Sequence, residues 1–83
     1  MNDNDRLKRI TVNPKIFGGK PIIRGMRIAV EHILGMLGAG ATAAEIVEHY
    51  PHLEGADIRA CLIYAQRVVG SERVEPAFID SPD

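Results

Sequence analysis

Several residue types that mark particular protein classes are scarce in this sequence. It has one cysteine, Cys61, and no tryptophan, and aromatic residues make up only 5% of the chain. A single cysteine excludes an internal disulfide and a cysteine-rich zinc site, which fits a reducing compartment. No apolar run approaches the ~20 residues that a membrane-spanning helix needs, and the polar, acidic residues 1–5 do not resemble a signal peptide. We therefore expect a cytoplasmic protein with no membrane partner.

The composition is that of one small globular domain. The 83 residues are 46% apolar and 25% charged, which is ordinary for a folded chain. So short a chain cannot build two independent cores, which argues against a multidomain enzyme.

The charges are distributed unevenly along the chain. Residues 1–5 carry two acids, residues 6–27 carry seven bases and no acid, and residues 28–83 carry three bases and nine acids, for a net charge of −1. The basic stretch has two interpretations. It is either a surface for a polyanion or a solvated strand edge that discourages edge-to-edge pairing.

In the N-terminal third we expect a flexible segment over residues 1–8, followed by strands. A short β-like run covers 9–12, and an extended run covers 21–28, with a glycine turn at Gly18-Gly19 between them. Arg24 interrupts the apolar alternation of the second run, and Gly25 suggests a bulge or a close backbone approach. The β segment therefore spans 9–28.

From Val30 the apolar period changes to that of helices. Three helices are predicted within 30–69, and Thr42 with Glu45 forms a capping box at the start of the second. Pro51 stops that helix, and Gly70-Ser71 ends the third. One domain over 9–70 is thus followed by an acidic tail, 71–83, with no expected fixed structure of its own.

The residue patterns indicate no catalytic, metal or cofactor site. Gly18-Gly19-Lys20-Pro21 lacks the spacing and the hydroxyl of a phosphate-binding loop. His49 and His52 have too few additional ligands for zinc, and Cys61 lies on an apolar helical stripe. We expect a protein that is not an enzyme and has no cofactor.

The fold expected is mainly α: a homeodomain-like three-helix unit with a short N-terminal β ribbon. The stretch from Thr42 to Val69 fits the dimensions of a helix-turn-helix. Three-helix units also serve purely as packing modules, so this pattern alone leaves DNA binding open.

Three segments carry a resemblance to a known family. They are Gly18-Gly19-Lys20-Pro21 with Gly25-Met26-Arg27, then Tyr50-Pro51-His52-Leu53, then Asp57-Ile58-Arg59-Ala60. Together they resemble the domain-of-unknown-function family numbered 433, over residues 9–69. The sequence departs from the family pattern at Met26, where threonine is usual, and at Glu54, where a serine or threonine usually caps the third helix.

The resemblance implies a prokaryotic, antitoxin-like (VapB-type) helix-turn-helix protein, paired with a PIN-like ribonuclease toxin and acting on operator DNA as a homodimer. Glu54 and Asp57 at the start of the third helix would be repelled by phosphate, so we expect the basic segment to contribute to DNA contact as much as this helix. The candidate DNA-binding residues are Arg9, Lys20, Arg24, Arg27, Arg59 and Arg67. The candidate toxin-binding residues are Arg73, Val74, Phe78 and Ile79. The alternative is a protein-interaction module without DNA binding.

Overall fold

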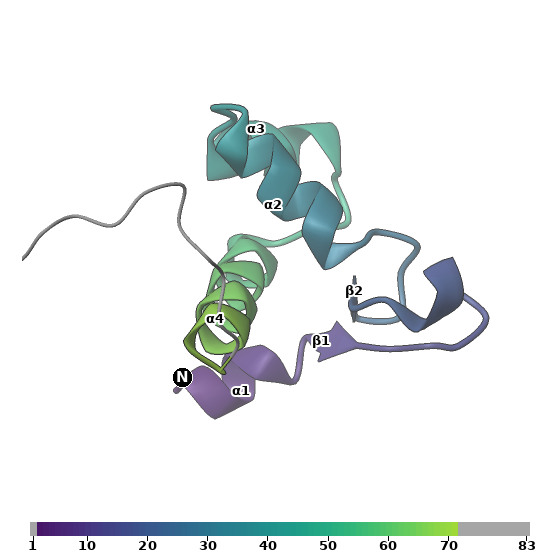
Figure 1. Cartoon of the computed structure of the whole chain (residues 1–83). Helices are drawn as coiled ribbons and strands as arrows, with labels where there is room; N and C mark the ends of the chain where they lie inside the picture. Colours follow the sequence, from purple (N-terminus) through teal and green to yellow (C-terminus); the bar gives the residue numbers. More distant parts are fainter. Residues whose placement is uncertain (1, 72–83) are drawn as a thin grey trace, which may run out of the picture.

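The protein is a small helical unit with a two-stranded antiparallel ribbon near its N-terminus, as the sequence predicts (Figure 1). The computed structural model describes residues 2–71. Its elements are α1 Asp3–Leu7, β1 Ile10–Thr11, the 3-10 turn Phe17–Gly19, β2 Ile22–Ile23, α2 Val30–Gly38, α3 Ala43–His49 and α4 Gly55–Ser71. None of the described helices is both long enough and apolar enough to cross a membrane.

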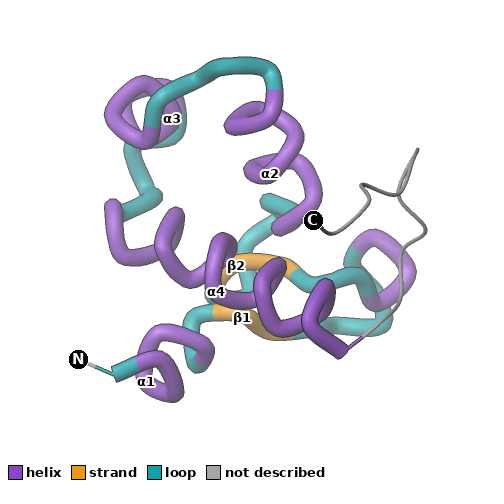
Figure 2. Tube along the Cα trace, turned by 60° about the vertical axis from the view of Figure 1, so that its left-hand side comes forward, coloured by secondary structure: helices purple, strands orange, loops and turns teal. Residues whose placement is uncertain are grey.

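The segment expected to be flexible, residues 1–8, contains helix α1, and the expectation is corrected there. The side chain of Asn2 caps the helix by accepting a hydrogen bond from the Asp5 amide at 2.9 Å. Asp3 and Asp5 place negative charge in the first turn, where the helix dipole favours it. Helix α1 packs against α4, and this contact holds a helix too short to be stable alone (Figure 2).

The ribbon is shorter than predicted because the chain turns back after β2. Ile10 pairs with Ile23 across the ribbon, and the Ile23 amide also donates to the carbonyl of Ile28 at 3.1 Å. The expected extended run over 21–28 is therefore wrong beyond Ile23. Arg24 and Gly25 adopt positive φ values of 44° and 71°, which create the turn.

The ends of α2 and α3 follow the local signals in the sequence. Gly40 has a φ of 102° just after α2, the left-handed conformation that terminates many helices. The Thr42 hydroxyl accepts from the Glu45 amide at 3.1 Å, and the Glu45 carboxylate accepts from the Thr42 amide at 2.9 Å. The predicted capping box is confirmed.

Helix α4 covers Gly55–Ser71. It therefore includes Gly70 and Ser71, the two residues that were predicted to end it. It crosses beneath α2 and α3, and the three helices enclose the core together with the ribbon (Figure 2). The core residues are Ile23, Val30, Ile33, Ile46, Leu53, Ile58 and Cys61. The predictions for the C-terminal tail fall on residues 72–83, outside the described part of the chain.

Candidate functional site

A buried carboxylate at the start of α4 gathers the most polar contacts in the described chain. The side chain of Asp57 is 0% exposed. Arg24 donates to both of its oxygens, from Nε to Oδ1 at 3.0 Å and from Nη2 to Oδ2 at 2.8 Å. Arg9 donates from Nη1 to Oδ1 at 3.0 Å, and the Glu54 amide donates to Oδ2 at 2.8 Å. These four hydrogen bonds compensate the loss of water around the charge.

The hydrogen bonds decide the protonation state of this carboxylate. Burial by itself raises the pKa of Asp57, but the bonds from Arg24, the Glu54 amide and Arg9 outweigh it and leave the pKa lowered. The hydrogen bonds to Asp57 likewise raise the pKa of both guanidinium groups. The cluster is therefore fully charged at neutral pH.

The second acid of this turn, Glu54, is drawn into the same cluster. Its Oε1 lies 3.3 Å from Arg9 Nη1 and 3.6 Å from Arg24 Nη2. The negative charges of Glu54 and Asp57 are thus balanced by the positive charges of Arg9 and Arg24 at the N-terminus of α4. Glu54 occupies the position where the family usually has a serine or threonine cap. Asp57 stabilises this end of the helix instead, through its bond with the Glu54 amide.

Arg24 links three parts of the fold. It lies at the end of the ribbon, pairs with Asp57 on α4 and donates from Nη2 to the carbonyl of His52 at 2.9 Å. His52 belongs to residues 50–54, which connect α3 to α4. The guanidinium therefore fixes the ribbon against the connection and the first turn of α4.

The six candidate DNA-binding residues divide into paired and unpaired cations. Arg9 and Arg24 are brought together on Asp57, Lys20 pairs with Glu31, and Arg67 lies 3.8 Å from Asp3. Arg27 and Arg59 are exposed and form no ion pair within residues 2–71. The candidates do not form one continuous surface.

Most of the basic stretch over 6–27 is compensated within the chain. Arg6 and Lys8 pair with acids of their own helix, at 3.6 and 3.5 Å. With Arg9, Lys20 and Arg24, five of the seven bases form ion pairs. Lys15 and Arg27 have no acid partner in the described residues. The uncompensated positive charge of this stretch is therefore smaller than the sequence suggests.

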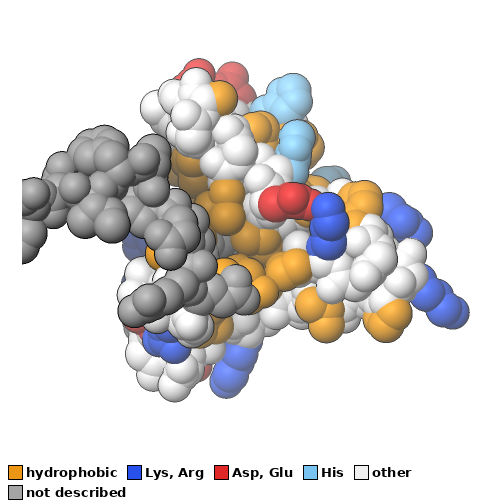
Figure 3. Space-filling model, viewed as in Figure 1, with side chains coloured by type: hydrophobic (Ala, Val, Ile, Leu, Met, Phe, Trp, Pro, Cys, Tyr) orange, Lys and Arg blue, Asp and Glu red, His pale blue; other side chains and the backbone are white. Residues whose placement is uncertain are grey.

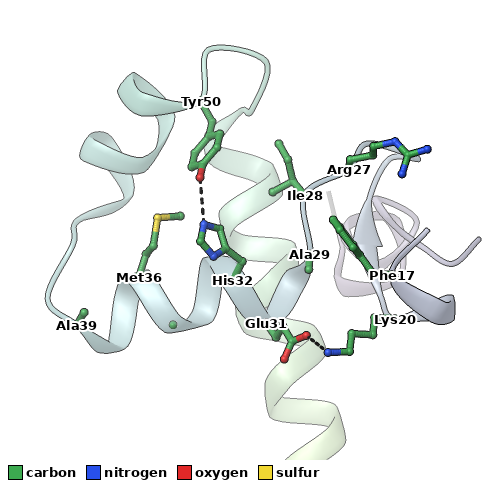
Figure 4. Close-up of a pocket in the computed structure, with 11 residues that line it drawn as sticks. Phe17, Lys20, Arg27, Ile28, Ala29, Glu31, His32, Met36, Ala39 and Tyr50 are labelled. Atoms are coloured by element: carbon green, nitrogen blue, oxygen red, sulfur yellow. Dashed lines mark hydrogen bonds and ion pairs between the residues drawn. The ribbon is translucent and has the colours of Figure 1, made fainter.

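An open groove that the sequence did not reveal lies along α2. It has a volume of about 900 Å³ and is lined by the Phe17 turn, residues 27–29, α2 and Tyr50. His32 Nε2 and the Tyr50 hydroxyl lie 3.0 Å apart, and Lys20 pairs with Glu31 at the edge (Figure 4).

No histidine or cysteine side chain forms a hydrogen bond with Asp57 in the described residues. The residues that the structure describes contain no group of three or more His, Cys, Asp or Glu side chains that could hold a metal ion. Cys61 is buried, as predicted, and burial raises the pKa of its thiol to about 11. This thiol is therefore protonated at neutral pH and suits packing rather than nucleophilic attack.

Comparison with known proteins gives a family match. A family model described as protein of unknown function (DUF433) matches residues 10–65. The uncharacterized protein y4eO of Sinorhizobium fredii (strain NBRC 101917 / NGR234) is 35% identical over 57 residues, which cover 69% of this chain. The alignment covers only 26% of that relative, so this chain spans a fraction of its length. No solved structure matches.

Proposed function

This chain belongs to the DUF433 family of proteins of unknown function, and from that premise we propose that it is the antitoxin of a type II toxin–antitoxin pair. In this proposal it binds operator DNA through a helix-turn-helix formed by α3 and α4, and it neutralises a PIN-like ribonuclease. It acts as a homodimer in a prokaryotic cytoplasm. The VapB-type role that the sequence resemblance implies is the basis for pairing it with a ribonuclease.

The observation that carries the DNA-binding proposal is the charge balance at the start of α4. In a helix-turn-helix, the second helix enters the major groove with its N-terminal residues. Glu54 and Asp57 lie at that end and by themselves would repel phosphate. Arg9 and Arg24 offset both charges, and Asp57 is buried. The end of α4 is therefore free of the electrostatic penalty that the sequence suggested.

Within this proposal we assign the candidate residues two roles. Arg9 and Arg24 position the helix and are held by Asp57. Arg59, two residues after Asp57 on α4, and Arg27, on the turn after β2, are exposed cations for phosphate contact. Lys20 and Arg67 have their own acidic partners and contribute less.

A salt titration tests this role. The full chain is titrated in a mobility-shift assay with a duplex from its own promoter and with an unrelated duplex of equal length, at several salt concentrations. We expect tighter binding to the promoter duplex and a log–log salt slope of about −0.9 per phosphate neutralised. Equal binding to both duplexes, or none at low salt, contradicts operator recognition.

The toxin-binding role is assigned to the C-terminal segment. Arg73, Val74, Phe78 and Ile79 remain its candidate residues, and they lie outside the described residues. Co-expression of the chain with the neighbouring reading frame should allow both products to be purified together and restore growth. Deletion of residues 71–83 should abolish this rescue while promoter binding persists. Full rescue by the truncated chain refutes the assignment.

A protein-interaction module without DNA binding is the second candidate. The five ion pairs that compensate the basic stretch favour it, because they leave Lys15 and Arg27 as the unpaired bases of that stretch within the described chain. In this candidate the helices are an assembly scaffold and the basic strands protect the ribbon edge, so the mobility-shift assay should show no promoter binding.

A further inference from the structure

A small apolar hollow lies between α2 and α4, on the face where apolar side chains gather in Figure 3. Its volume is about 240 Å³, and its walls are Pro21, Val30, Leu34 and Tyr64. The ion pair of Lys20 with Glu31 forms its polar edge. A hollow of this size accommodates one or two large apolar side chains.

The C-terminal end of α4 continues from Tyr64, which lines this hollow. Tyr64, Val68 and Ser71 are spaced by four and three residues, so they lie along one face of the helix. Val68 is 36% exposed between the hollow and the helix end. From Tyr64 to Ser71 the helix rises only about 10 Å, at ~1.5 Å per residue. Ser71, the last described residue, therefore lies on the face of α4 that carries the hollow.

The segment that follows has a composition that matches the hollow. We propose that Phe78 and Ile79 of the same chain dock in it. Six residues lie between Ser71 and Phe78, and the seven residue steps from one to the other span up to ~24 Å when extended. This reach exceeds the return along α4 to Tyr64. Phe78 and Ile79 supply the apolar surface, and the polar edge of the hollow is already neutralised by the ion pair of Lys20 with Glu31.

In this proposal the segment that carries Phe78 and Ile79 is either docked in the hollow or bound to a partner. Phe78 and Ile79 are also the candidate toxin-binding residues, so a toxin would have to compete with the hollow for them. This consequence rests on the proposed function, whereas the docking itself does not. The contact would keep the segment covered in the free protein and release it to a partner.

Tryptophan fluorescence tests the docking, because the chain has no tryptophan of its own. The full chain carrying Phe78→Trp should emit at shorter wavelength and be quenched less by acrylamide than the full chain carrying Asp83→Trp. Equal emission and quenching for the two variants overturns the proposal. The readout uses the isolated protein, so this failure leaves the DNA and toxin proposals standing.

Two substitutions on α4 locate the docking site. Val68→Asp, added to Phe78→Trp, should shift the emission to longer wavelength, because it places a charge on the route to the hollow. Leu62→Asp is the matched control: Leu62 is 50% exposed on another side of α4 and should leave the emission unchanged. Equal effects of the two substitutions place the segment elsewhere, and a blue shift that appears only at high protein concentration assigns the hollow to a second copy. Either result contradicts docking within one chain.

Discussion

Arg24 donates hydrogen bonds to both carboxylate oxygens of Asp57, from Nε at 3.0 Å and from Nη2 at 2.8 Å, although the two residues are 33 positions apart. This bidentate pair joins the end of the ribbon to the first turn of α4. Because Asp57 is fully buried, the pair depends on the complete set of hydrogen bonds around it. It both fixes the position of α4 and removes an unfavourable charge from the helix end that we propose to meet DNA.

Asp57→Asn should destabilise the fold strongly. The substitution keeps the shape of the side chain but leaves Arg9 and Arg24 without their buried counter-charge. Breaking a buried ion pair by removing one partner costs about 3 kcal/mol or more. Urea denaturation measures the loss, with Glu48→Gln, an exposed acid on α3, as the control. Equal midpoints for the two variants would show that the cluster contributes little.

The same pair predicts how stability depends on pH. The pKa of Asp57 is lower in the folded chain than in the unfolded chain, where it is about 3.9. Its stabilisation is therefore fully present above the unfolded value and is lost as pH falls through the folded value. We expect the gap in unfolding free energy between wild type and Asp57→Asn to narrow between about pH 5 and pH 2. A gap that is constant over this range contradicts the assignment.

Arg24→Lys tests the geometry of the pair rather than its charge. A lysine ammonium keeps the positive charge but cannot donate in a planar, bidentate fashion to a carboxylate. Its single nitrogen also cannot replace the separate Nε and Nη2 donors that bind Asp57 and the His52 carbonyl. Thermal unfolding should show a lower midpoint for Arg24→Lys than for Arg27→Lys, whose side chain is exposed and unpaired within residues 2–71. Equal midpoints would mean that charge alone suffices.

The capping box of α3 allows a local test of the helix-turn-helix. Thr42→Ala removes the hydroxyl that accepts from the Glu45 amide and should cost about 1 kcal/mol. Thr42→Ser keeps the hydroxyl and should retain most of the stability. Urea denaturation of the two variants measures the difference. The same loss for both would indicate that the methyl group, rather than the cap, matters.

Local signals made much of the helical fold predictable. The capping box at Thr42, the glycine at Gly40 and the proline at Pro51 act within a few residues of where they stand in the sequence. Such short-range chemistry can be read without knowing the tertiary structure. The start of α1 also had a local signal, the Asn2 cap with acids after it, which the assumption of a frayed terminus overrode.

The Asp57 cluster could not be predicted in the same way, because its members come from positions far apart. Arg9 and Arg24 are 48 and 33 residues from Asp57. Two clues were present in the sequence: Arg24 interrupts an apolar alternation, and Asp57 lies four residues before the buried Cys61. Each clue indicates a charged side chain at a position that faces the core. Their pairing becomes visible only when the ribbon and α4 are placed together.

The most direct test of the account is the salt dependence of promoter binding by two single variants. Arg59→Ala removes an exposed cation of α4 that has no acid partner within residues 2–71, whereas Lys8→Ala removes an exposed cation just after α1 that pairs with Asp5. The account predicts that Arg59→Ala weakens binding and reduces the magnitude of the log–log salt slope by about one, while Lys8→Ala leaves both unchanged. Unchanged affinity and slope for Arg59→Ala would contradict the placement of α4 at the DNA.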